Sequence, residues 1–200
     1  MTRFLALGDS YTIGEGVADA ERWPDQLVAR LRDNGIVVTD LHIIARTAWT
    51  TDELSDAIDA EKPKGPFDLV TLMIGVNDQY RSRPVREYES EFQRLLKRAV
   101  GFSGNRATKT LALSIPDWGA TPFSEGRDRA LIGGEIAAYN ACGETLATKA
   151  GVTWIDVTEA SRAMQTDPDL VAVDGLHPTA AMYARWVDIM VPYALAALRS

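Results

Sequence analysis

The sequence lacks several features that would each indicate a particular kind of site. It contains one cysteine, Cys142, so it can form neither an internal disulfide nor a paired-cysteine metal or redox motif. Its only two histidines are His42 and His177, which argues against a histidine-rich metal centre. We therefore expect a protein that works without a metal ion or an organic cofactor.

Long apolar runs and an excess of positive charge are also missing. No run of 18 apolar residues occurs, so we expect no membrane span. The first apolar run is too short for the core of a signal peptide, which predicts a cytoplasmic protein. The net charge is −7, whereas nucleic-acid binding needs concentrated Lys and Arg, so we expect no nucleic-acid partner.

Two common motifs are absent as well. The nucleophile elbow G-x-S-x-G does not occur, which excludes the commoner α/β-hydrolase arrangement of a serine nucleophile. Gly14-Glu15-Gly16 begins like a dinucleotide-binding loop, but Asp19 stands where the third glycine is required. No phosphate-binding lysine motif appears either, so a nucleotide site is not indicated.

Strand-like and helix-like segments alternate along the chain. The composition is 46% hydrophobic and 24% charged, which is typical of a globular protein, and the length suits one domain over residues 1–200. The expected strands are 3–7, 36–45, 67–74, 108–115 and 152–157. The expected helices are 22–34, 51–61, 84–100, 128–150 and 179–200. This alternation predicts a parallel sheet with helices on both faces.

Two helices carry residues that weaken helical structure, and three long stretches show no regular pattern. Gly133-Gly134 is expected to be a weak spot in its helix, and Pro192 a possible kink. The longest irregular stretches are 75–83, 116–127 and 164–178.

Several reactive residue types follow directly after predicted strands. In open α/β sheets the site lies beyond the carboxyl ends of the strands. The stretches that fall there are Gly8-Asp9-Ser10, 45–50, 75–78 and 116–118. We expect these separated stretches to meet at one edge of the sheet.

Ser10 is the candidate nucleophile, and it needs a base to take its proton. His42 lies inside a predicted strand and is interpreted as a partly buried strand residue. His177 lies in the loop "VDGLHPTA", where reactive groups are commonly found. Asp174, three residues earlier, is placed to accept from one ring nitrogen and orient the other. The alternative is a capped helix start in which Asp174 and His177 are merely solvated.

The stretch "GVND" offers donors for a developing oxyanion. Gly75 ends a strand, Asn77 can point its amide into the site, and Asp78 can brace the loop. The alternative is a simple turn, because Gly, Asn and Asp all favour turns.

Three of these stretches together resemble a known family. Gly8-Asp9-Ser10, the segment 75–78 and the segment 174–178 resemble blocks I, III and V of the GDSL/SGNH hydrolases, in that order along nearly the whole chain. The resemblance implies a three-layer α/β/α sandwich of the flavodoxin-like kind, with five parallel strands.

The resemblance also implies residue roles. Ser10 would be the nucleophile, His177 the base and Asp174 its orienting acid. The backbone amide of Ser10 and the side chain of Asn77 would line the oxyanion hole.

The sequence departs from the family pattern at block II, where a glycine usually supplies a third oxyanion donor. In "ARTAWTT" that position falls on Ala48, with Thr47 as the other candidate. Alanine keeps the N–H group, so we expect Ala48 to be the third donor if its backbone avoids positive φ.

The substrate pocket is less well defined by the sequence. The loop residues that could ring the site are Trp49, Tyr80, Asp117, Trp118 and Phe123. For each of these, closing the edge of the core is an equal alternative. We assign to the pocket Asp9, Trp49, Asp78 and Trp118.

Charge and length give weaker indications about the substrate. The acidic net charge does not favour a strongly anionic substrate, but Arg46, Arg81 and Arg83 near the same edge leave that class open. The chain has little spare length for a lid, which indicates an open cleft and short acyl groups.

The leading hypothesis is a serine esterase that cleaves small carboxylic esters, acetyl esters among them, through an acyl-enzyme on Ser10. An acyltransferase to a sugar or another alcohol uses the same residues and is the first alternative. A non-catalytic binding module on the same fold is the second. The oligomeric state is not readable from the sequence.

Overall fold

Five short apolar segments of the chain pair into one parallel sheet in the computed structural model, which describes residues 2–200. The strands are β1 (Thr2–Gly8), β2 (Val38–Ala45), β3 (Leu69–Met73), β4 (Thr110–Leu113) and β5 (Thr153–Ile155). Their order across the sheet is β2-β1-β3-β4-β5, and all neighbours run parallel. Every residue of β3 and β4 is buried, as expected for a parallel sheet that is covered on both faces.

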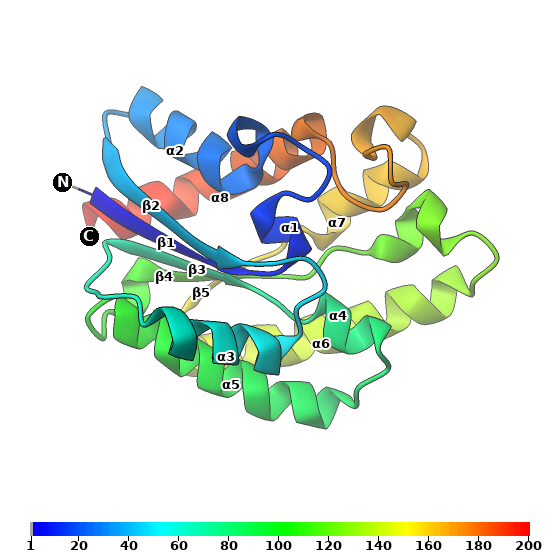
Figure 1. Ribbon diagram of the computed structural model, residues 1–200, viewed down its shortest axis with the longest axis horizontal. Coiled ribbons are helices and arrows are strands. Elements are labelled where there is room, and N and C mark those ends of the chain that lie inside the picture. Colours follow the sequence, from blue (N-terminus) through cyan, green and yellow to red (C-terminus); the bar gives the residue numbers. More distant parts are fainter. Residues whose placement is uncertain (1) are drawn as a thin grey trace.

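The long helices form a layer on each face of this sheet (Figure 1). On one face lie α2 (Trp23–Asp33) and α8 (Ala180–Arg199), which pack against each other. On the other face lie α3 (Thr51–Glu61), α5 (Val85–Phe102) and α6 (Arg129–Lys149). The predicted three-layer α/β/α sandwich is therefore confirmed, and its strand order is that of flavodoxin-like folds.

The core lies between the sheet and the two helical layers, and each long helix contributes one apolar face to it. Trp23 and Leu27 of α2 are fully buried, and the Trp23 ring packs against the Phe4 ring of β1 at 6.4 Å. Trp186 and Met190 of α8 are fully buried in the same layer. These faces account for the helical periodicity that the sequence shows.

Three short helices lie at the carboxyl edge of the strands, where Figure 1 shows them close together. They are α1 (Ser10–Ile13), α4 (Val76–Tyr80) and α7 (Thr158–Ser161). The prediction that 75–83 is irregular is therefore wrong, because one helical turn follows β3 directly. The stretches predicted to be irregular at 116–127 and 164–178 also contain short 3-10 helices.

The weak spot predicted in α6 is not observed. The helix continues through Gly133 and Gly134, because Ile132 and Ile136 anchor it to the core on either side. Pro192 lies inside α8, which also continues past it. Within residues 2–200, no helix is both long and apolar enough to cross a membrane.

The tight turn after β1 explains why the chain needs a glycine before the candidate nucleophile. Gly8 is paired with Met73 of β3. A Cβ atom at Gly8 would lie 2.1 Å from Thr12 Oγ1 and 2.7 Å from the Met73 carbonyl oxygen. Only glycine fits there, so β1 and β3 end side by side with Ser10 directly beyond them.

Candidate active site

A cavity of about 120 Å³ lies at the carboxyl edge of the sheet. It is lined by Ser10, Tyr11, Val76, Asn77, Tyr80, Trp118, Phe123, Leu176 and His177. The structure therefore brings together three residues that the sequence places far apart and that we predicted to meet: Ser10, Asn77 and His177.

Ser10 is the first residue of α1. Asp9 caps this helix, and its Oδ1 atom accepts a hydrogen bond of 3.1 Å from the Tyr11 amide. The first amides of a helix have no partner in a preceding turn, so the Ser10 N–H group is available to the cavity. The Ser10 side chain itself is nearly buried, at 4% exposure.

Asp9 lies beneath the cavity and is almost completely buried. Its Oδ2 atom has no hydrogen-bond partner among the described residues. Burial raises the pKa of Asp9 to about 8, and the hydrogen bond from the Tyr11 amide only partly offsets this effect. Asp9 therefore holds a proton at neutral pH and acts as a neutral helix cap.

Asp174 and His177 form a closely bonded pair in the loop before α8. His177 Nδ1 lies 2.6 Å from Asp174 Oδ2. The other carboxylate oxygen accepts from the Leu176 amide at 2.9 Å and from the His177 amide at 3.0 Å. Burial acts to raise the pKa of Asp174, but these hydrogen bonds outweigh it and hold the pKa below its usual value.

The Asp174–His177 pair determines which tautomer the neutral imidazole adopts. An ionised Asp174 accepts a hydrogen bond from the Nδ1–H group of His177, so in the neutral imidazole Nε2 is the acceptor. The His177 side chain is 8% exposed, and its ring packs against the Tyr11 ring at 5.1 Å. Ser10 and His177 share the cavity but are not hydrogen-bonded to each other; such contacts often tighten only when a substrate binds.

Asn77 lies on α4, directly after β3. Gly75 before it has φ of 128°, and a Cβ atom there would lie 2.5 Å from Tyr88 Cε2, so the turn requires glycine. Asn77 Nδ2 donates to the Trp49 carbonyl at 2.9 Å. The amide nitrogen has two hydrogens, and the second is available to a group in the cavity.

Asp78 braces this edge from inside the protein. Its carboxylate accepts from the Thr51 amide at 3.0 Å and from Thr51 Oγ1 at 2.8 Å, which ties α4 to the start of α3. Burial is the largest influence on its pKa, which is raised. The carboxylate is 1% exposed and holds the Trp49–Thr51 loop against Asn77.

Ala48 does not meet the condition that we set for the third oxyanion donor. Its φ is 68°, in the left-handed region, and its carbonyl oxygen accepts a bond of 2.7 Å from Arg81 Nη2. Ala48 is exposed and does not line the cavity. Thr47, the other candidate, is also exposed and bonds through its hydroxyl to Glu15.

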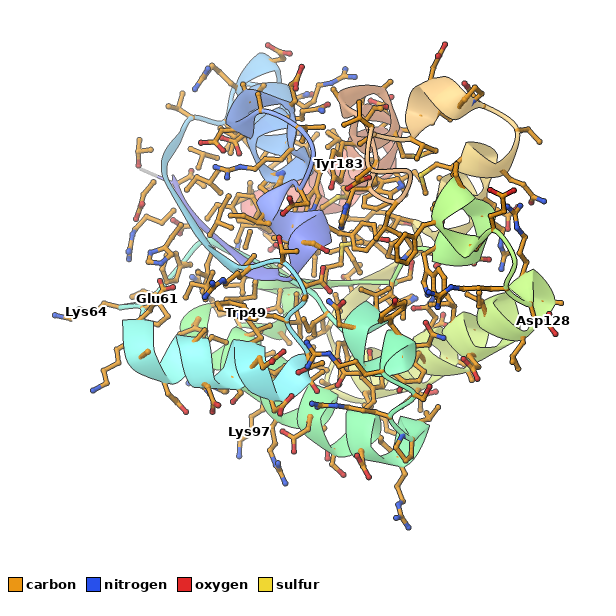
Figure 2. All side chains as sticks on the ribbon, turned by 45° about the vertical axis from the view of Figure 1, so that its right-hand side comes forward. Trp49, Glu61, Lys64, Lys97, Asp128 and Tyr183 are labelled. Atoms are coloured by element: carbon orange, nitrogen blue, oxygen red, sulfur yellow. The ribbon has the colours of Figure 1, made fainter. Side chains whose placement is uncertain are left out.

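The residues assigned to the substrate pocket differ in their position relative to this cavity. Of these four residues only Trp118 lines the cavity, whereas Asp9, Trp49 and Asp78 do not. The carboxyl groups of Asp9 and Asp78 are buried and accept hydrogen bonds from the backbone amides of Tyr11 and Thr51 instead. Trp49 is half-buried against the core beside the start of α3, where Figure 2 labels it.

Five other residues complete the lining. Tyr80 and Phe123 are among the loop aromatics considered above. Tyr11, Val76 and Leu176 also line it, and none of them was predicted to do so from the sequence. Tyr11 and Leu176 are direct neighbours of Ser10 and His177 in the sequence, and this adjacency is the signal that could have found them.

The second histidine lies elsewhere, as predicted. His42 is inside β2, and its Nε2 atom lies 3.1 Å from Glu61 Oε2. Glu61, which Figure 2 labels, is the last residue of α3, and neither it nor His42 lines the cavity. Within residues 2–200, no group of three or more His, Cys, Asp or Glu side chains is arranged to hold a metal ion.

Solved structures of the same fold include several esterases. TesA has 19% sequence identity and a TM-score of 0.76, over 98% of this chain and 100% of that one. The psychrotrophic esterase EstA from Pseudoalteromonas sp. has 17% identity and a TM-score of 0.75, over 100% of both chains. A mutant of Axe2, an acetyl-xylooligosaccharide esterase from Geobacillus Stearmophilus, has 19% identity and a TM-score of 0.67, over 98% of this chain and 94% of that one.

At these identities the likeness shows the fold alone, and the family is established by sequence. No curated protein matches the chain. The sequence profile of the GDSL-like Lipase/Acylhydrolase family matches residues 6–185 and so spans the three motifs and strands β2 to β5. The chain therefore belongs to the GDSL-like lipase/acylhydrolase family and is an ester hydrolase of the GDSL type.

Proposed function

We propose that this protein hydrolyses small carboxylic esters, including acetyl esters, through an acyl-enzyme on Ser10. His177 acts as the base and Asp174 orients it. The observation that carries this proposal is the Asp174–His177 pair at 2.6 Å, whose histidine shares one small cavity with Ser10.

In the first step the Ser10 hydroxyl oxygen attacks the ester carbonyl carbon while His177 Nε2 takes the hydroxyl proton. Asp174 stabilises the imidazolium that forms. The negative charge on the former carbonyl oxygen is held by the Ser10 amide and by the free N–H of Asn77. The intermediate then collapses and breaks the ester C–O bond, and the alcohol leaves with the proton from His177.

In the second step water takes the place of the alcohol. His177 removes a proton from the water, which attacks the acyl carbon on Ser10. The same donors hold the second oxyanion. Collapse breaks the bond to Ser10 Oγ, which recovers its proton from His177, and the carboxylic acid is released.

The cavity supports a small acyl group. Its volume is about 120 Å³, and its aromatic side is firmly held. Trp118 Nε1 donates to Gln79 Oε1 at 2.7 Å, and Gln79 Nε2 donates to Glu135 Oε2 at 2.7 Å. A wall anchored in this way resists the widening that a long acyl chain requires.

Hydrolysis of 4-nitrophenyl esters from acetate to octanoate tests the proposal. We expect Ser10→Ala to lower kcat/KM by at least about 10³-fold, because the nucleophile is lost. In the wild type, kcat/KM should fall as the acyl chain lengthens. Ser90→Ala, an exposed serine on α5, is the control and should leave the rates unchanged. Full activity in Ser10→Ala would show that the ester bond is broken by another group.

A further inference from the structure

Three aromatic side chains form one wall of the cavity. Tyr80 lies on α4, Trp118 on the 3-10 helix Trp118–Ala120, and Phe123 on the 3-10 helix Pro122–Ser124. We call Tyr80, Trp118 and Phe123 the aromatic wall. Their ring centroids are 5.4, 6.0 and 6.1 Å apart. Trp118 is buried, whereas Tyr80 and Phe123 are 43% and 39% exposed, so the wall runs from the cavity to the surface.

One cation lies against all three rings. The Arg127 guanidinium carbon is 5.3 Å from the Tyr80 ring centroid and 5.4 Å from those of Trp118 and Phe123. Arg127 belongs to the loop that leads into α6, next to Asp128, which Figure 2 labels at the outer edge of the molecule. Contact with aromatic faces attracts a guanidinium and restricts its motion.

This guanidinium is not neutralised by an acid. Among residues 2–200 no carboxylate oxygen lies within 4.0 Å of it, although Glu125 and Asp128 are close in sequence. Two other arginines of this edge are paired with acids. Arg81 is paired with Glu53 at 3.3 Å, and Arg83 with Asp52 at 2.6 Å. Arg127 therefore keeps its charge available beside the aromatic side of the cavity.

Its hydrogen-bonding capacity is also largely unused. A guanidinium has five N–H donors. Within the described residues 2–200, the only side-chain hydrogen bond of Arg127 is from Nη2 to Tyr80 Oη at 3.3 Å. Aromatic rings contact the group without using these donors. A guanidinium held in this way matches a carboxylate, which accepts two parallel N–H bonds.

We propose that Arg127 selects ester substrates that carry a negatively charged group, of which a carboxylate is the simplest. The proposal rests on the function proposed above for the same cavity. The charged group can lie at the far end of the acyl chain, beyond the aromatic wall, or on the alcohol. Either position would bring a carboxylate close to Arg127, and matched pairs of substrates distinguish the two positions.

Two pairs of esters test the proposal. For the alcohol side we compare 4-acetoxybenzoate with its neutral methyl ester. For the acyl side we compare monophenyl glutarate with phenyl pentanoate, which has the same acyl backbone without the charge. Each pair is assayed with wild type, Arg127→Met and Arg127→Lys. Met keeps an apolar stem over the rings, and Lys keeps the charge. Arg94→Met, an exposed arginine on the distant α5 helix, controls for the change in net charge.

We expect Arg127→Met to lower kcat/KM for the anionic member of at least one pair by about tenfold, the size typical of a charge-assisted hydrogen bond. The neutral member should change by less than about threefold. Arg127→Lys should recover part of the loss, and added salt should reduce the wild-type preference. The pair that responds identifies the side of the ester that carries the charge. Equal losses for both members, or no loss for either, would overturn the proposal.

A binding measurement separates this inference from the function on which it rests. Calorimetric titration of Ser10→Ala with glutarate and with 4-hydroxybenzoate needs no turnover. We expect at least one of these anions to bind about tenfold more weakly when Arg127→Met is added. If the wild type does not hydrolyse the esters but anion binding depends on Arg127, only the proposed reaction is overturned. Hydrolysis that requires Ser10, with binding indifferent to Arg127, would overturn only the inference.

Discussion

At the scale of single residues, glycines set the shape of the proposed site. Gly8 and Gly75 precede Ser10 and Asn77, and at each position a Cβ atom would meet a neighbour at less than 3.0 Å. The neighbours are Thr12 at Gly8 and Tyr88 at Gly75. The motif glycines therefore let two adjacent strand ends turn sharply, so that the nucleophile and the amide donor face one cavity.

Ala48 occupies the position where such a glycine is expected, and its Cβ atom makes the left-handed backbone conformation unfavourable. A residue with a Cβ atom at φ of 68° is strained by about 1–2 kcal/mol. Glycine removes that strain but adds freedom to the unfolded chain. We expect Ala48→Gly to raise the free energy of unfolding by about 0.5–1 kcal/mol, or a few degrees in Tm. Thermal and urea denaturation measure this, and esterase activity should be kept.

A second alanine gives the matched control for this prediction. Ala60 is exposed in the regular helix α3. Ala60→Gly should lower the free energy of unfolding by up to about 1 kcal/mol, since glycine is unfavourable in helices. Opposite signs at the two positions would support the strain at Ala48. A loss of stability in both would contradict it.

At the scale of secondary structure, two of the three glycines of α6 have opposite surroundings. At Gly134 an added Cβ atom meets nothing within 4 Å, whereas at Gly143 it would lie 2.7 Å from Trp154 Cη2. Gly134→Ala should therefore raise the free energy of unfolding by about 1 kcal/mol. Gly143→Ala should lower it by about 1–3 kcal/mol, because the Trp154 ring must move. Urea denaturation of both variants checks this, and a gain from both would contradict the contact with Trp154.

The same helix shows what local patterns can and cannot predict. Periodicity identified each long helix and each strand. It also marked Gly133-Gly134 as weak, which is wrong because buried neighbours on either side outweigh a cost of about 1 kcal/mol for each glycine. The predicted ranges for β3, β4 and β5 run past the ends of these strands, since burial continues beyond the last paired residue. Ile115 and Val157, for example, are buried just beyond β4 and β5.

At the scale of the whole molecule, the strand order decides which residues meet. The sequence predicted parallel strands with reactive residues at their carboxyl ends, but not that β1 lies beside β3. This adjacency brings Ser10 and Asn77 into one cavity at the point where the strand order reverses, the usual position of a site in such sheets. That residues 1–200 form one domain stays a prediction.

Some residues of the proposed site could be predicted from the sequence and others could not. Ser10 and Asn77 were predictable because they follow strand ends directly, and His177 because it belongs to a motif next to a predicted helix start. The position of Arg127 over the aromatic wall was not, since it depends on α4 and two 3-10 turns meeting in space. The positive φ of Ala48 could not be predicted either, because alanine has no preference for a left-handed backbone.

The stability of the whole molecule should depend on pH through Asp9. Its pKa is about 8 in the folded protein, against 3.8 for an exposed carboxyl group, chiefly because of burial. Below pH 4 both states hold the proton. Between pH 4 and 8 the unfolded chain releases it while the folded protein keeps it, so stability falls as the pH rises. This contribution reaches at most about 1.4 kcal/mol for each pH unit and stops changing above about pH 8.

Asp9→Asn isolates this contribution, because asparagine caps a helix equally well and has no proton to lose. We expect the stability of the variant relative to the wild type to increase steadily from pH 5 to pH 8, as measured by urea denaturation at each pH. Asp33→Asn makes the same substitution on the exposed surface of α2 and should give a nearly constant difference. If Asp9→Asn also gave a constant difference, the carboxyl group would have to ionise equally in the folded and unfolded states. Its unpartnered Oδ2 atom would then need a hydrogen-bond donor that residues 2–200 do not supply, and the neutral cap beneath Ser10 would be wrong.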